Sequence, residues 1–138
     1  MTEQEAKNLA EPIVKEVVNC MAEGRYDLIP DYAGFQDESI TIDDFKEWAV
    51  GYLEDNEFSH YDKYGVPNNF QPKYDKSLYH QFSVYLYNNG TGFEVDYDLT
   101  TDSEINDLTL KTSFHRSWLP KNQQKNHQHF SFQAPQYH

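Results

Sequence analysis

The stretch "FSVYLYNNGTGFEVDYDL", residues 82–99, decides the fold, because it predicts a β-hairpin with one apolar face. Apolar residues occupy every second position on both sides of Asn89-Gly90, a dipeptide that favours a tight hairpin turn. A two-residue turn there places apolar residues opposite one another, in the pairs Phe82–Tyr97, Val84–Val95 and Leu86–Phe93. A turn at Gly90-Thr91 would preserve the same faces, so the pattern predicts the faces more firmly than the pairs.

A third strand follows at "LTLKTSFH", residues 108–115, where the alternation continues. Its inward positions are Leu108, Leu110 and Phe114, and its outward positions are Thr109, Lys111, Ser113 and His115. One register of this strand on the second would place Leu99 opposite Leu108. Lys111 then faces Asp96 across the strand pair, an opposite-charge contact that contributes roughly 0.2–1 kcal/mol.

Helical patterns precede the strands. Residues 41–55 begin with the capping box of Thr41 and Asp44 and continue with an amphipathic face. That face comprises Phe45, Trp48, Ala49, Tyr52 and Leu53. A short helix is expected at residues 25–32, ending near Pro30. Helices followed by an antiparallel meander predict an α+β fold, with N-terminal helices packed on a β-sheet.

The first helix carries an apolar stripe at a spacing of four and ends at Gly24. The stripe comprises Leu9, Ile13, Val17 and Met21, joined by Val14 and Val18. Its start has two alternatives. Thr2 and Glu5 form a capping box with Pro12 inside the helix, or Asn8 caps the helix and Pro12 falls in its first turn.

Residues 56–78 look like a long irregular connection, yet they carry five aromatic residues. These are Phe58, Tyr61, Tyr64, Phe70 and Tyr74. Structureless loops of this length are uncommon, so the segment either contains a short strand or folds over the core as a lid.

We expect one α+β domain over residues 1–118 and a polar, flexible tail over residues 119–138, in which "FSF" at 130–132 could add an edge strand. A single cysteine, Cys20, excludes an internal disulfide and fits a buried helical position. No run approaches the ~18 apolar residues of a membrane span, and the polar N-terminus is no secretory signal. The cytoplasm is the expected compartment.

Six carboxylates crowd residues 94–107, and such a group can serve in four roles: a metal loop, catalysis, a solvated strand face or a partner surface. They are Glu94, Asp96, Asp98, Asp102, Glu104 and Asp107. A calcium loop starting at Asp96 would need glycine where Thr101 stands and a bidentate Glu where Asp107 stands. Side chains that share a solvated face do not have the shifted pKa that acid–base catalysis needs. A solvated face or a partner surface therefore remains.

Other chemistry is sparsely represented. His127, His129 and His138 lack a further ligand at a fixed spacing, and no nucleophile elbow, phosphate loop, C-x-x-C or nucleic-acid signature occurs. The sequence therefore predicts no catalytic residue, no metal site and no cofactor. An aromatic pocket between helices and sheet is the alternative to plain core packing. Its lining would be Tyr26, Asp43, Trp48, Tyr52, His80 and Tyr97.

Two stretches resemble known families. "CMAEGRYDLI", residues 20–29, is similar to the A-x-G-D-Y-x-x-L opening of NTF2-like (cystatin-like α+β) domains, with Arg25 where Asp is common. "VDYDLTTDSEINDLTL", residues 95–110, resembles a motif of small bacterial domains of uncharacterised function. That motif is a V-D-x-D-L-W-T strand followed by S-D-L-T-L, and Thr100 and Asn106 here replace its Trp and Ser.

The resemblance covers residues 5–32 and 79–118 and implies a curved antiparallel sheet wrapping the helices, without a catalytic residue. NTF2-like domains include enzymes, ligand binders and protein–protein adaptors, so the fold does not select among these functions. The enzymes among them resemble ketosteroid isomerases or dehydratases and use a buried Asp or His with Tyr.

The uneven distribution of charge along the sequence leads to the functional hypothesis. Residues 1–107 hold 7 Lys/Arg and 23 Asp/Glu, a net charge of −16, whereas residues 108–138 hold four Lys/Arg and no acid. Such a body repels nucleic acid and anionic membranes and attracts basic proteins. The leading hypothesis is a non-enzymatic bacterial protein-binding domain, specifically an immunity protein that neutralises a basic toxin domain. The expected docking residues are Tyr85, Tyr87, Glu94, Asp96, Asp98, Asp102, Glu104 and Asp107.

Two alternatives stand beside it. One is an NTF2-like small-molecule-binding protein or isomerase/dehydratase-type enzyme that uses the aromatic pocket. The other is a homodimer through the open sheet face, against which the like charges there argue unless Lys111 and Arg116 neutralise them.

Overall fold

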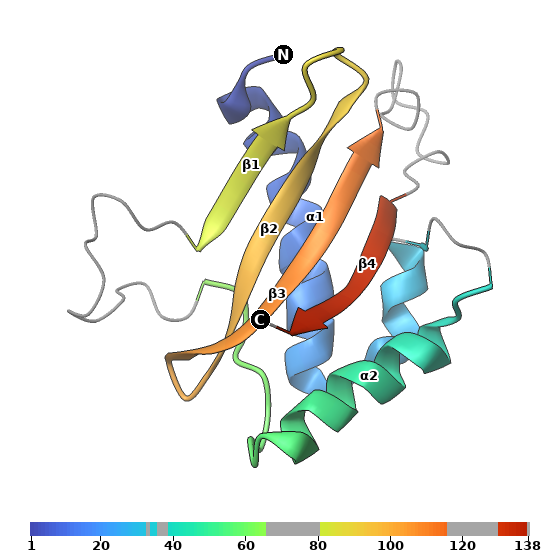
Figure 1. Cartoon of the computed structure of the whole chain (residues 1–138), viewed down its shortest axis with the longest axis vertical. Helices are drawn as coiled ribbons and strands as arrows, with labels where there is room; N and C mark the ends of the chain where they lie inside the picture. The colour runs from blue at the N-terminus through green and yellow to red at the C-terminus, as the bar shows by residue number, and fades with distance from the viewer. Residues whose placement is uncertain (33, 36–38, 66–80, 116–129, 138) are drawn as a thin grey trace.

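Helices come first along the chain and strands follow (Figure 1). The computed structural model describes residues 1–32, 34–35, 39–65, 81–115 and 130–137; at 107 and 130–137 it describes the backbone alone. The helical elements are α1 (Glu3–Glu23), the 3₁₀ helix η1 (Tyr26–Asp31) and α2 (Ile42–Asp55). The strands are β1 (Phe82–Leu86), β2 (Gly92–Thr101), β3 (Glu104–His115) and β4 (Phe130–Tyr137).

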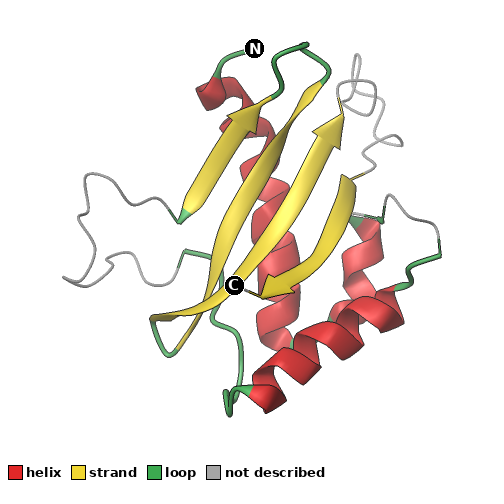
Figure 2. Ribbon diagram, viewed as in Figure 1, coloured by secondary structure: helices red, strands yellow, loops and turns green. Residues whose placement is uncertain are grey.

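The four strands form one antiparallel sheet in the order β1-β2-β3-β4. Helix α1 runs behind the sheet against β1 and β2, and α2 lies beside β4 (Figure 2). Among the described residues, all helices lie on one side of the sheet. The predicted α+β fold, N-terminal helices packed on an antiparallel sheet, is confirmed.

The predicted hairpin register is confirmed, with Phe82, Val84 and Leu86 opposite Tyr97, Val95 and Phe93. The turn is closed by Tyr87, whose N–H donates to the Gly92 carbonyl (3.0 Å) and whose carbonyl accepts from Gly90 N–H (3.1 Å). Gly90 adopts φ +71°, a conformation that favours glycine. The predicted pairing of Asp96 with Lys111 across β2 and β3 is also present.

The core lies between the helices and the inward face of the sheet. Within it the rings of Phe93 and Phe114, opposite each other on β2 and β3, stack at 4.7 Å between centroids. Helix α1 starts with the capping box of Thr2 and Glu5 and holds Pro12 in its interior, so of the two predicted starts the Asn8 cap is wrong.

Two residues of the predicted helix stripes lie outside the core. Leu9 is 37% exposed and Trp48 38% exposed. On α1 the small side chains of Ala6 and Ala10 take the buried positions. Small alanine side chains let this side of α1 pack closely against its neighbours. The buried stripe of α1 therefore runs through Ala6 and Ala10 and leaves Leu9 outside it. On α2, buried Phe45, Ala49 and Tyr52 fill the inner side and leave Trp48 at its margin.

The connection after α2 packs on the core. We call residues 57–65 the strap. Tyr61 in the strap is buried, and its hydroxyl donates to the Ala49 carbonyl (2.6 Å). Tyr64 stacks on Tyr97 at 5.1 Å. The described part of the predicted connection thus folds over the core, and residues 66–78 lie outside the described residues.

The segment assigned to the tail includes β4, which pairs with β3 from Leu108↔Tyr137 to Phe114↔Phe130. The edge strand suggested by "FSF" is therefore present in the structure. Residues 119–129 and 138 lie outside the described residues.

Thr112 on β3 gives a stability prediction. It is buried opposite Val95, and its hydroxyl has no hydrogen-bond partner in the described part of the chain. We expect Thr112→Val to raise the free energy of unfolding by about 1 kcal/mol, because a methyl group removes an unsatisfied polar atom. Urea denaturation monitored by circular dichroism measures the change.

The matched control is the same substitution at Thr101. Its hydroxyl donates to the His60 carbonyl (2.6 Å) and accepts from the Asn106 side chain (3.2 Å). Thr101→Val should lower the free energy of unfolding by about 1 kcal/mol or more. Equal effects of the two substitutions would contradict the assignment at Thr112.

Candidate functional site

The outward side of the sheet carries three predicted carboxylates, Glu94, Asp96 and Asp98, at the less buried positions of the alternating strand β2. Lys111 on β3 lies between two of them, with Nζ 3.2 Å from Asp96 Oδ2 and 3.9 Å from Glu94 Oε1. Asp98 Oδ1 accepts a hydrogen bond from the Thr109 hydroxyl (2.9 Å). All three carboxylates are therefore held in place by partners on β3.

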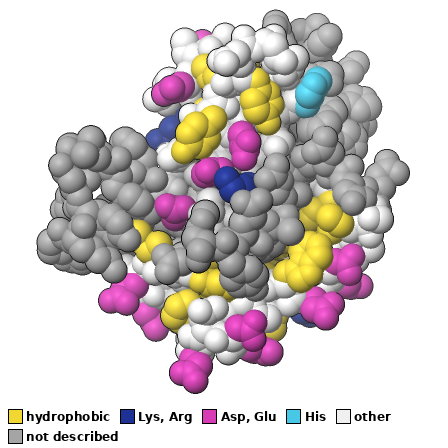
Figure 3. Space-filling view, in the orientation of Figure 1, with side chains coloured by type: hydrophobic (Ala, Val, Ile, Leu, Met, Phe, Trp, Pro, Cys, Tyr) yellow, Lys and Arg dark blue, Asp and Glu magenta, His cyan; other side chains and the backbone are white. Residues whose placement is uncertain are grey.

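Two tyrosines accompany this group. Tyr85 is 54% exposed and lies opposite Glu94, and Tyr87, the residue after β1, is 37% exposed. Figure 3, which looks onto the sheet side opposite the helices, shows apolar side chains beside acidic ones with a basic side chain among them. We call Tyr85, Tyr87, Glu94, Asp96, Asp98 and Lys111 the outer face. An open depression of about 570 Å³ adjoins it, lined by Leu86, Tyr87, Asn88, Asn89 and Thr91.

The other predicted carboxylates lie elsewhere. Asp102 is in the turn between β2 and β3, and Glu104 begins β3; both are exposed. Asp107 is on β3, and its side chain lies outside the described part. Asp102 follows Asp96 by six positions, roughly 20 Å at the rise of a strand. The carboxylates that sequence reasoning treated as one row thus form an outer-face group and a turn group.

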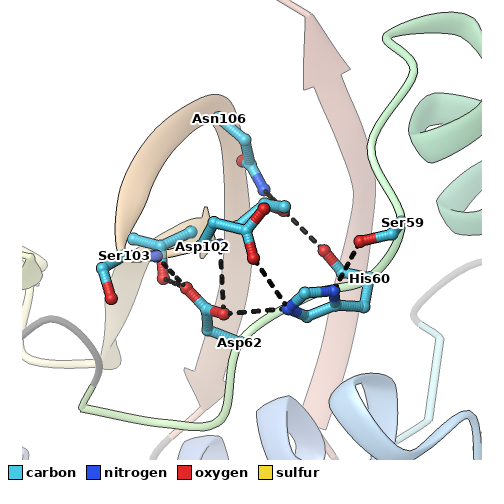
Figure 4. Close-up of polar contacts among 8 residues, drawn as sticks. Ser59, His60, Asp62, Asp102, Ser103 and Asn106 are labelled. Carbon is cyan, nitrogen blue, oxygen red and sulfur yellow. Dashed lines mark hydrogen bonds and ion pairs between the residues drawn. The ribbon is translucent and has the colours of Figure 1, made fainter.

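The turn group includes a contact that sequence reasoning missed. Asp62 of the strap points at the β2–β3 turn, where its Oδ2 accepts from Ser103 N–H (2.7 Å) and from the Thr100 hydroxyl (2.9 Å) (Figure 4). Its Oδ1 accepts from Asp102 N–H (3.2 Å), and its own N–H donates to the Thr100 carbonyl (2.9 Å). Positive φ angles at Asp102 (52°) and Ser103 (66°) accompany this arrangement of the turn N–H groups.

His60 lies beside this carboxylate. Its Nε2 is 3.3 Å from Asp62 Oδ1 and 3.5 Å from Asp102 Oδ1, and its Nδ1 is 2.7 Å from the Ser59 hydroxyl (Figure 4). Ser, His and Asp are the residue types of nucleophilic catalysis. Here, however, the turn occupies both oxygens of Asp62, and Ser59 is exposed to water. The arrangement is suited to clamping the strap on the turn.

The residues of the predicted pocket do not share one location. Tyr26, Tyr52 and Tyr97 are buried, whereas Trp48 and Asp43 are exposed, and His80 lies outside the described residues. The buried rings face other rings, Tyr26 with Phe45 at 6.1 Å and Tyr52 with Phe58 at 6.2 Å. Burial raises the pKa of Tyr26 and that of Tyr97 to about 12, so both hydroxyls stay protonated at neutral pH.

Comparison with known families adds one finding. Residues 18–117 match a family described as "Domain of unknown function (DUF7668)". The chain belongs to this family. The DUF7668 match runs from the end of α1 to the end of β3 and contains both the outer face and the strap. No curated protein and no solved structure gives a significant match.

Three features of the DUF7668 chain concern its described residues: metal ligands, membrane-spanning helices and the thiol of Cys20. There, no group of three or more His, Cys, Asp or Glu is placed to hold a metal ion, and no helix is long and apolar enough to cross a membrane. The predicted tail histidines, 127, 129 and 138, lie outside those residues. Burial raises the pKa of the Cys20 thiol, with further contributions from Glu16 and Glu23, so the thiol form is favoured.

Proposed function

We propose that this chain is a protein-binding domain that docks a basic protein on its outer face. The observation that carries the proposal is the exposed Tyr85 ring beside two carboxylates, Glu94 and Asp96, on a sheet side with no helix among the described residues. Tyrosine contributes a large contact area with little loss of conformational freedom and is enriched at protein interfaces. The carboxylates supply charge complementarity to Lys or Arg of a partner.

The contacts of Lys111 support this role. A carboxylate that is already held at 3.2 Å by Lys111 loses little side-chain freedom when a partner binds. The net charge of −16 over residues 1–107 adds a long-range attraction for a basic protein, which speeds association and weakens as salt is added. More specifically, we propose an immunity protein that neutralises a basic toxin domain. The support for this role is the charge complementarity between the acidic chain and a basic toxin.

Affinity capture with variant baits tests the proposal. The full chain is immobilised at low salt and exposed to a lysate of its source cells, alongside the double variant Tyr85→Ser/Tyr87→Ser. Trp48→Ser is the matched control, because it removes another exposed aromatic ring that lies on α2. Bound proteins are identified by mass spectrometry, and calorimetry with the purified partner then measures affinity at two salt concentrations.

We expect a basic protein that the wild type and Trp48→Ser retain and the double variant loses. A loss of affinity of about 10-fold or more for the double variant corresponds to the removal of interface anchors. Capture of no basic protein, or equal capture by all three baits, would reject docking on the outer face.

The alternative, a ligand-binding or isomerase/dehydratase-type cone, requires an enclosed pocket with a reactive group. Tyr97 instead stacks on Tyr64, and its hydroxyl accepts a hydrogen bond from Gly65 N–H (2.9 Å). This packing favours the protein-binding proposal over the alternative.

A further inference from the structure

The two edge strands of the sheet, β1 and β4, differ in whether they carry residues that prevent pairing with other strands. Sheet edges in stable proteins commonly carry charges or proline, which prevent pairing with other strands. The sequence of β4 includes Pro135, whereas β1, "FSVYL", has neither a charge nor a proline. Between Lys76 and Glu94 the chain has no Asp, Glu, Lys or Arg.

The hydrogen-bond pattern shows which groups of β1 face its open edge. Gln81 accepts from Asp98 N–H and Tyr87 donates to the Gly92 carbonyl, so the odd-numbered residues between them direct their backbone groups at β2. The alternate residues, Phe82, Val84 and Leu86, therefore direct N–H and C=O away from β2. Among the described residues, no strand pairs with this edge.

We propose that two copies of this chain pair antiparallel through β1, with Val84 of one copy opposite Val84 of the other. This register places Phe82 opposite Leu86 and Ser83 opposite Tyr85, and every outward N–H and C=O of the strand meets a partner. Apolar side chains meet on the inward side and polar-tipped ones on the outward side. A two-fold interface requires such a self-complementary strand, and the two sheets join into one.

The sheet carboxylates of the two copies oppose this pairing only weakly. The closest of them are on β2, and three strand spacings, roughly 14 Å, separate the β2 strands of the two copies. That distance exceeds the screening length of about 8–10 Å at physiological salt. Because each copy carries a net charge of −12, added salt strengthens the pairing. Salt would weaken capture of a basic protein, so the two effects have opposite signs.

Sedimentation velocity of the purified full chain tests the proposal without any partner, so its result is independent of the proposed function. Val84→Pro removes an outward N–H, a change that edge strands tolerate, and it also trims a half-buried side chain that packs against the core. Val84→Thr is the matched control, since it keeps the N–H and the branched shape. Circular dichroism verifies the fold of each variant. Leu86→Glu is a second variant at a partly exposed position, and it places a charge against Phe82 of the second copy.

We expect wild type and Val84→Thr to shift from monomer to dimer as concentration rises from about 1 to 200 μM, and to shift further at high salt. Val84→Pro and Leu86→Glu should weaken dimerisation by about 10-fold or more. A wild-type chain that stays monomeric throughout this range, or folded variants that dimerise like the wild type, would overturn the proposal.

Discussion

Replacing Tyr61 with alanine is expected to lower the free energy of unfolding by about 4 kcal/mol, the loss typical of a buried aromatic ring truncated to a methyl group. Although Tyr61 lies in the strap, its side chain is as buried as the inward side chains of the core strands. Its hydroxyl donates to the Ala49 carbonyl at 2.6 Å. The missing ring would leave a cavity between strap and α2, which the surrounding backbone can only partly fill. Equilibrium urea denaturation measures the loss.

Tyr61→Phe is the matched control. It keeps the ring and removes only the hydroxyl, so we expect a loss of about 1 kcal/mol. If Tyr61→Ala cost no more than Tyr61→Phe, the ring would contribute nothing by its burial and the strap would not be part of the core.

Asp62→Ala is the second large effect, with an expected loss of about 3 kcal/mol. The carboxylate accepts from two backbone N–H groups of the β2–β3 turn and from the Thr100 hydroxyl, and its side chain is only 11% exposed. Alanine leaves these donors without their acceptor, and hydrogen bonds to charged groups contribute about 1.5–3 kcal/mol each. Water reaching the exposed turn offsets part of the loss.

Asp102→Asn provides the comparison for Asp62, because asparagine tolerates the positive φ at this position and removes the charge. The Asp102 side chain is 78% exposed, and its carboxylate lies 3.5 Å from His60 Nε2. We expect a change within about 0.5 kcal/mol, as for most exposed ion pairs. If both substitutions lowered the free energy of unfolding by similar amounts, the strap would be stabilised by negative charge near His60 in general. The hydrogen bonds from the turn to Asp62 would then not be the cause.

The fold was predictable from sequence where the signals are local. Alternation with a period of two and the Asn89-Gly90 turn predicted the hairpin register, and Thr41 with Asp44 predicted the start of α2. The pairing of Lys111 with Asp96 followed from a separate register between β2 and β3, the one that places Leu99 opposite Leu108. The additional proximity of Lys111 to Glu94 did not follow, because it depends on the reach of a flexible side chain.

The strap and the limits of the core were not predictable in the same way. Asp62 meets Thr100 and Ser103, about 40 residues away, and no periodic pattern links such positions. The aromatic content of residues 56–78 was the available signal, and it indicated packing without naming a partner. The exposure of Leu9 depends on how closely α1 packs against the sheet. The buried alanines of α1 allow that close packing, but their pattern does not show which side of α1 the sheet covers.

Helix α1 packs against β1 and β2, which lie late in the chain, and this order has a consequence during synthesis. Glu23 ends α1, whereas Thr101 ends β2. At about 5–20 residues per second, a ribosome needs roughly 4–16 s to make the intervening stretch. For that time the alanine and valine stripe of α1 has no sheet to cover it. Until the sheet is translated, the glutamates of α1 favour the solubility of the nascent chain.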